Sequence, residues 1–227
     1  MRPEIGLWMV ADGAGGHDHG EVASQMLADA LSSTQSQSGS DLIADIRAIA
    51  MRTHQVLRDR AEAESGRSGK AVTSAATIVV LLARDAHYAC LWAGDSRVYR
   101  LRGGRLQQLT RDHSLVQALV DEGAISEAEA EGHPHANVIT RAIGADGAEP
   151  TLDKLTDRAE PGDRFLLCSD GLNKALDDRT IGRLVGANEP ASSLIDAALE
   201  CGVRDNVTAI VVEYVAEDPD DTLLRRH

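Results

Sequence analysis

Residues 10–17 read Val10-Ala11-Asp12-Gly13-Ala14-Gly15-Gly16-His17, an apolar run that ends in one acidic residue and a group of glycines. The segment before it, 5–10, is apolar enough for a buried strand, so Asp12 is expected where that strand passes into a loop. Glycines permit positive φ and let the backbone approach a ligand closely. A carboxylate beside exposed peptide carbonyls suits a hard divalent cation such as Mg²⁺ or Mn²⁺. The alternative interpretation is an ordinary strand-to-helix turn.

The composition limits the class of protein. With 227 residues and 43% apolar content, the chain is expected to form one domain over residues 1–216, followed by a polar tail at 217–227. The net charge of −13 argues against nucleic acid or an anionic membrane as a partner. The three cysteines are odd in number and far apart, which favours free thiols in a reducing compartment. We therefore expect a cytoplasmic monomer without a membrane span.

The apolar periodicity after the glycines predicts two helices, over about 19–33 and from a cap at Ser40 or Asp41 to about Glu64, with a loop over 65–70. Two pairs of apolar runs around short turns, 77–82 with 86–93 and 98–102 with 105–109, predict hairpins of an antiparallel sheet.

The second half of the chain repeats this alternation of helices and strands. Ser114 is expected to start a short helix, and Ser126 with Glu129 indicates a capping box. The irregular segment 132–147 is interpreted as a flap. The remaining expected elements are strands over 163–169 and 207–215 and helices near 178–184 and 192–201.

Asp12, Asp170 and Asp205 share one local setting, an acidic residue beside Gly or Asn at the end of an apolar strand. If the sheet brings them together, their mutual repulsion requires cations between them. Two metal ions about 4 Å apart can share a water molecule and lower its pKa towards neutrality, which suits attack on phosphorus. The three residues are therefore candidate catalytic residues through a metal-activated water.

Seven motifs in order extend this pattern over residues 8–214, and together they resemble the metal-dependent protein phosphatases of the PPM, or type 2C, family in its compact bacterial form. The motifs are Ala-Asp-Gly-Ala-Gly-Gly-His (11–17), Thr-Ser-Ala-Ala-Thr (73–77), Ala-Gly-Asp-Ser-Arg-Val-Tyr (93–99), Leu-Thr-Arg-Asp-His-Ser (109–114), Ile-Thr-Arg-Ala-Ile-Gly (139–144), Ser-Asp-Gly-Leu (169–172) and Asp-Asn-Val-Thr (205–208).

The resemblance implies an α+β fold, a four-layer α-β-β-α sandwich with two central antiparallel sheets. It implies two Mg²⁺ or Mn²⁺ ions, bridged by Asp12 and held also by the Gly13 carbonyl, Asp170 and Asp205. Asp95 matches a residue that can hold a third ion, and the alternative for Asp95 is an ion pair with Arg97.

The sequence departs from the family pattern at two places. Some members carry a histidine, proposed as a general acid, where Ala14 stands. Nothing in residues 1–4 matches the family's N-terminal Arg-x-x-Asn-Glu-Asp motif, which supplies a phosphate-binding arginine. We therefore expect a truncated or late-assigned start, with weaker binding of the second metal and reduced activity. Arg97 or Arg141 is the candidate substitute for substrate binding.

The leading functional hypothesis is a serine/threonine phosphoprotein phosphatase that opposes a bacterial Ser/Thr kinase and acts on that kinase or its target. The alternative is a catalytically silent phosphatase-like domain that binds a phosphoprotein or kinase for regulation. A metal-dependent phosphodiesterase of nucleic acid is the third hypothesis, which the net charge of −13 disfavours.

Overall fold

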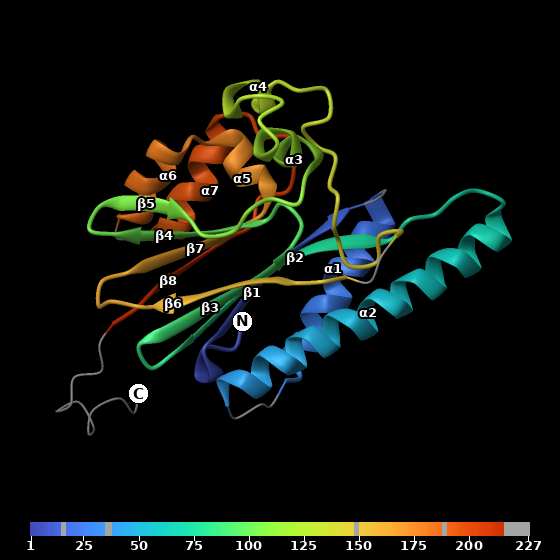
Figure 1. Ribbon diagram of the computed structural model, residues 1–227, viewed down its shortest axis with the longest axis horizontal. Helices are drawn as coiled ribbons and strands as arrows, with labels where there is room; N and C mark the ends of the chain where they lie inside the picture. Colours follow the sequence, from blue (N-terminus) through green and yellow to red (C-terminus); the bar gives the residue numbers. More distant parts are fainter. Residues whose placement is uncertain (15–16, 35–37, 148–149, 188–189, 216–227) are drawn as a thin grey trace.

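The computed structural model describes residues 1–14, 17–34, 38–147, 150–187 and 190–215. Gly15 and Gly16 of the glycine-rich stretch and the predicted tail at 217–227 lie outside these ranges. Two four-stranded antiparallel sheets lie face to face, and helices cover the outer face of each (Figure 1). The predicted four-layer α-β-β-α sandwich is confirmed.

The first sheet has the strand order β1-β2-β3-β6. Its strands are β1 (Leu7–Ala14), β2 (Ala75–Arg84), β3 (His87–Ala93) and β6 (Asp153–Arg158), and a short 3-10 turn, η1 (Pro3–Ile5), precedes β1. Helices α1 (His17–Ser32) and α2 (Gly39–Ser68) cover its outer face (Figure 1). In β2, Ile78 and Val80 pack towards the helices while Val79 and Leu81 pack towards the second sheet. Because both faces are buried, the strand is continuously apolar over 78–83 rather than at alternate positions.

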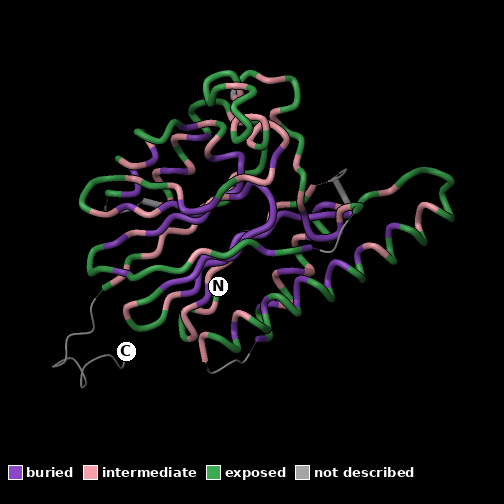
Figure 2. Tube along the Cα trace, viewed as in Figure 1, coloured by how far each residue is buried: buried purple, intermediate pink, exposed green. Residues whose placement is uncertain are grey.

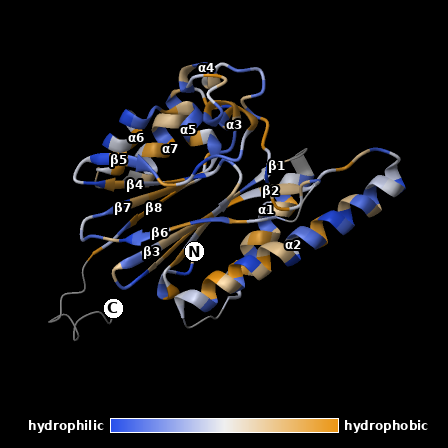
Figure 3. Ribbon diagram, viewed as in Figure 1, coloured by the Kyte–Doolittle hydropathy of each residue, from blue (hydrophilic) through white to orange (hydrophobic). Residues whose placement is uncertain are grey.

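The second sheet has the order β5-β4-β7-β8. Its strands are β4 (Arg97–Arg102), β5 (Arg105–Gln108), β7 (Arg164–Cys168) and β8 (Ala209–Glu213). Helices α5 (Asp170–Ala175), α6 (Asp178–Val185) and α7 (Pro190–Glu200) pack on its outer face. The central strands of both sheets are buried (Figure 2) and strongly apolar, whereas α2 is apolar on one side only (Figure 3).

The connection between β5 and β6 carries two short helices, α3 (Leu115–Asp121) and α4 (Glu127–Glu131). Ser114 caps α3, and the capping box of Ser126 and Glu129 is confirmed. The segment 132–147 has no helix or strand, as predicted, but it is not detached from the body. Bridges join Ile139 to Ser114 and Ile143 to Ala76.

Several element predictions were wrong in detail. Strand β1 does not end before Asp12, which pairs with Thr77 inside the sheet. The cap of α2 is Ser38, and the helix continues through the predicted loop to Ser68. Strand β6 and helix α5 were not predicted. The two hairpins belong to different sheets, because sequence periodicity does not show which sheet a hairpin joins.

None of the helices in the described part of the chain combines the length and the apolarity needed to span a lipid bilayer.

Candidate metal site

A cavity of about 290 Å³ lies where the two sheets meet at one end of the sandwich. It gathers all three of the aspartates that the sequence analysis selected. The residues that line it are Asp12, Gly13, Ala14, Thr77, Asn137, Ile139, Asp170, Lys174 and Asp205.

The strand directions explain why distant residues meet here. Strand β1 contacts β7 and β8 across the interface between the sheets, and Asp12 lies near its C-terminal end. Strand β7 leads directly to Asp170, and Asp205 precedes the antiparallel partner β8, so both reach the same end of the second sheet. The side chain of Ser169 joins the two segments, since its hydroxyl accepts from the Thr208 amide at 3.1 Å and donates to the Asn206 carbonyl at 3.3 Å.

Two glycines permit the close backbone approaches around the cavity. A Cβ at Gly13 would lie 2.3 Å from the carbonyl carbon of Gly20, so β1 and α1 can pack here only without a side chain. A Cβ at Gly171 would lie 2.4 Å from the carbonyl oxygen of Asn206. Glycine permits positive φ, but Gly13 is not among the residues that adopt it. Its constraint is packing.

The electrostatics of the cavity are dominated by carboxylates. Burial is the largest of the causes that together raise the pKa of Asp12 to about 7. The others, in decreasing order, are the charge of Asp170, a hydrogen bond with that carboxyl group, and the charges of Asp205 and Asp95. Asp95 is 5% exposed and does not line the cavity. Burial, followed by the charge of Asp170, raises the pKa of Asp95 to about 6. The site therefore favours a bound cation.

Two carboxylate oxygens have unmet bonding capacity. Oδ1 of Asp95 and Oδ1 of Asp170 are buried and have no hydrogen-bond partner. Leaving a buried charged oxygen unpaired is costly, and at Asp170, which lines the cavity, the unpaired oxygen indicates a ligand role. Carboxylate oxygens are also the donors that Mg²⁺ and Mn²⁺ prefer.

The three aspartates nevertheless do not form a closed ligand set. Among the described residues, no group of three His, Cys, Asp or Glu side chains is close enough to hold a metal ion. Asp205 is exposed, and its Oδ1 accepts from the amide of Asn206 at 2.8 Å. The donor chemistry and the shared cavity fit divalent ions, while the side chains stand further apart than in a complete ligand cluster.

Neither of the arginines that were candidates for substrate binding lines the cavity. Arg97 binds Asp112 through Nε at 2.9 Å and through Nη2 at 2.6 Å, and its Nη1 donates to the Tyr99 hydroxyl at 2.9 Å. The alternative pairing of Arg97 with Asp95 is thus replaced by a pairing with Asp112. Arg141 binds Asp153 at 2.6 Å. Their substrate role stays a prediction, and these ion pairs give it no support.

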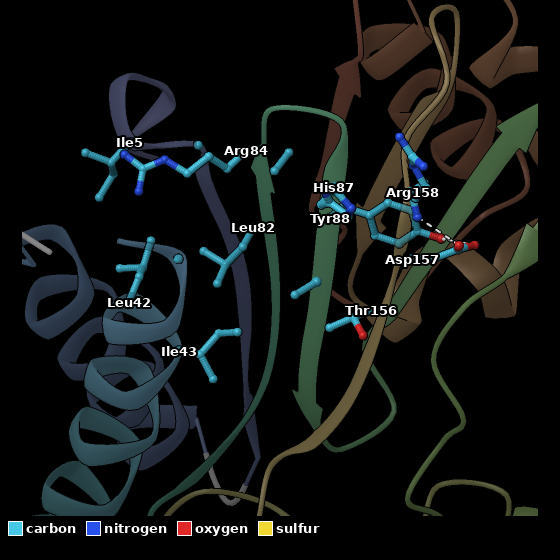
Figure 4. Close-up of a pocket in the computed structure, with 14 residues that line it drawn as sticks. Ile5, Leu42, Ile43, Leu82, Arg84, His87, Tyr88, Thr156, Asp157 and Arg158 are labelled. Carbon is cyan, nitrogen blue, oxygen red and sulfur yellow. Dashed lines mark hydrogen bonds between the residues drawn. The ribbon is translucent and has the colours of Figure 1, made fainter. Parts of the chain in front are cut away.

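A larger cavity, about 380 Å³, lies at the opposite end of the first sheet, between the start of α2 and strands β2, β3 and β6 (Figure 4). Its walls include Leu42, Ile43 and Leu82. Asp157, the acidic residue among those that line it, pairs with Arg100 at 3.2 Å. This cavity lacks converging ligands, so its size does not make it the metal site.

Sequence reasoning missed Lys174, Asn137 and Ile139, which also line the metal cavity. Lys174 follows Asp170 by four residues, and this spacing could have predicted that the two side chains meet. It does so only if a helix starts at Asp170, which the sequence analysis did not predict.

Comparison with known proteins identifies the family of this chain. Residues 3–209 match the protein phosphatase 2C family, and the chain belongs to that family. The serine/threonine protein phosphatase PstP of Mycobacterium tuberculosis is 40% identical over 220 residues, covering 95% of this chain and 42% of PstP. The chain thus spans less than half the length of that relative.

A further relative and a solved catalytic domain match over most of their own length. The serine/threonine phosphatase stp of Listeria monocytogenes is 33% identical, with 90% of this chain and 83% of stp covered. The solved structure of the PstP catalytic domain in complex with two manganese ions superposes with a TM-score of 0.79 at 37% identity, covering 92% of this chain and 87% of that one.

Proposed function

We propose that this chain is a serine/threonine phosphoprotein phosphatase that uses two divalent ions, Mg²⁺ or Mn²⁺. The observation that carries the proposal is the convergence of Asp12, Asp170 and Asp205 on one cavity in a member of the protein phosphatase 2C family. The two manganese ions in the related PstP catalytic domain support the choice of metal.

In this proposal, Asp12, the Gly13 carbonyl, Asp170 and Asp205 would hold the ions. Asp95, which is 5% exposed, is the candidate for a third ion. Bound ions of this kind act as Lewis acids and lower the pKa of water. The chain's own contribution would be to position Asp12 on strand β1 and to join the Asp170 segment to Asn206 through the Ser169 hydroxyl.

The wider predictions remain part of the proposal. Residues 1–216 would act as one domain and as a monomer in the cytoplasm. The substrate would be a phosphoprotein, either a Ser/Thr kinase or its target, since the related PstP and stp are serine/threonine phosphatases. The net charge of −13 disfavours nucleic acid as substrate or partner.

Hydrolysis of a phosphothreonine peptide tests the proposal. Activity should require Mn²⁺ or Mg²⁺, disappear with EDTA, and fall at least about 100-fold in Asp170→Asn, more than is typical of a residue that only orients a ligand. Asp59→Asn is the matched control, because Asp59 lies exposed on α2 and bonds only within that helix to Gln55. Activity that survives both EDTA and Asp170→Asn would exclude the proposed mechanism.

A further inference from the structure

Lys174 is the only cationic side chain among the described residues that line the metal cavity. Helix α5 begins at Asp170, so Lys174 follows one turn later on the same helix face. Its Nζ donates to Oδ2 of Asp170. The Lys174 side chain is 39% exposed and that of Asp170 is 11% exposed, so the ammonium lies where the buried carboxylate meets solvent.

The cavity around this ion pair carries an excess of negative charge. Asp12, Asp170 and Asp205 line the cavity with a single ammonium to balance them, and Oδ1 of Asp170 has no partner. A divalent ion bound to Asp170 would compete with Lys174 for the carboxylate and repel the ammonium. The ammonium can leave without a backbone change, because lysine carries its charge on a flexible four-carbon stem.

The same cavity would receive the phosphate group of a substrate. A phosphate dianion adds negative charge beside the aspartates, and lysine is a common point-charge partner of phosphate. Arg97 and Arg141 are committed to Asp112 and Asp153 outside the cavity. Lys174 is therefore the cation, among the described residues, that lines the cavity in which the phosphate would lie.

We propose that Lys174 neutralises Asp170 in the metal-free protein, is displaced when divalent ions bind, and then donates hydrogen bonds to the phosphate of the substrate. This role rests on the proposed phosphatase function. It makes Lys174 a competitor of the metal in one state and a ligand of the substrate in the other, so removing the ammonium should change the two affinities in opposite directions.

The first measurement is calorimetric titration of the full chain with Mn²⁺ alone. Lys174→Met should bind Mn²⁺ about threefold to fivefold more tightly than the wild type, the size expected for losing a half-exposed ion pair. Lys154→Met is the matched control, since Lys154 is exposed on β6 and does not line the cavity. Unchanged or weaker Mn²⁺ binding in Lys174→Met would overturn the competitor role.

The second measurement is binding of inorganic phosphate to the Mn²⁺-loaded proteins. Lys174→Met should bind phosphate about tenfold more weakly and show a raised KM for a phosphothreonine peptide, as expected when one charge-assisted contact is lost. Lys174→Arg, which keeps the cation, should retain most of the phosphate affinity. Equal phosphate affinity in Lys174→Met and the wild type would overturn the ligand role.

The two proposals fail in different ways. If the wild type neither binds Mn²⁺ nor hydrolyses the peptide, the proposed function fails and this inference fails with it. If the wild type does both and Lys174→Met does not shift the two affinities in opposite directions, only the role of Lys174 is wrong.

Discussion

Asp12 is surrounded by the carboxyl groups of Asp170, Asp205 and Asp95, and burial together with these charges raises its pKa to about 7. In the metal-free protein Asp12 is therefore mostly protonated below pH 7 and mostly ionised above it. A cation must displace this proton at low pH. A bound cation should lower this pKa, because its charge offsets both the burial and the repulsion from the neighbouring carboxylates.

Mn²⁺ binding should accordingly release protons in a pH-dependent way. At about pH 6 we expect release of most of one proton per chain from Asp12, and at about pH 8 almost none, with apparent Mn²⁺ affinity increasing between these values. Calorimetry in two buffers of different ionisation enthalpy measures the release. Equal release at both pH values would show that Asp12 does not carry this proton.

The pKa of Asp163 is shifted in the opposite direction, downwards, and this residue stabilises the fold rather than the metal site. Its carboxylate is 1% exposed and accepts two hydrogen bonds from Arg102, at 2.6 Å each. Burial by itself would raise the pKa of Asp163, but the bonds from Arg102 and from the Glu160 amide outweigh it, so the pKa is lowered. The stabilisation is present above the ordinary pKa of an aspartate and is lost as pH falls through the lowered value.

Asp163→Asn should therefore lower the free energy of unfolding by about 3 kcal/mol at neutral pH, because it leaves Arg102 beside a neutral group. The difference from wild type should shrink as pH falls below about 4. Urea denaturation across this range measures it. Glu160→Gln removes the exposed partner of the same arginine and should cost less than about 1 kcal/mol. A cost for Asp163→Asn no larger than this control would contradict the assignment.

At the residue scale, the sequence predicted the three aspartates because each follows or precedes an apolar strand in a family motif. It did not predict Lys174, because a single lysine in a polar segment normally indicates a solvated surface. It also did not predict the ion pair between Arg97 and Asp112. The two side chains meet only because the turn that carries Asp112 folds back beside β4. Contacts of this kind depend on tertiary structure.

The helix and strand elements show a similar limit. Strand β6 was not predicted from the sequence. Its residues, Asp153–Arg158, lie at the edge of a sheet, and most of their side chains are charged and exposed. Leu155 is the residue of this strand that packs against the core. Helix α5 has only six residues and contains Gly171, which disfavours a helix. Gly171 is there because the Asn206 carbonyl lies too close for a side chain. In both elements packing overrides local propensity.

The start of α2 gives a test at this scale. The sequence suggested Ser40 or Asp41 as the cap, whereas the Ser38 hydroxyl accepts from the Asp41 amide at 3.2 Å. Ser38→Ala should destabilise the protein by about 1 kcal/mol, and Ser40→Ala should change it by less than about 0.5 kcal/mol. Thermal and urea unfolding of both variants decide which serine is the cap, and a larger loss in Ser40→Ala would contradict the structure.

At the scale of the whole molecule, three apolar layers alternate with four layers of secondary structure, and the middle layer joins the two sheets. The proposed metal site lies across that interface: Asp12 is in the first sheet, whereas Asp170 and Asp205 lie in the segments that follow β7 and precede β8 of the second. Bound ions would thus connect the two sheets. The resemblance to the family motifs predicted the four layers. The motifs could not predict how far apart the three carboxylates stand without metal.

The most direct test is an anomalous difference map from crystals of the full chain grown with Mn²⁺. We expect two manganese peaks in the cavity, with Asp12 between them and Asp170 and Asp205 drawn in as ligands. An empty cavity, or manganese bound only elsewhere, would contradict the assignment of these three aspartates as the metal site.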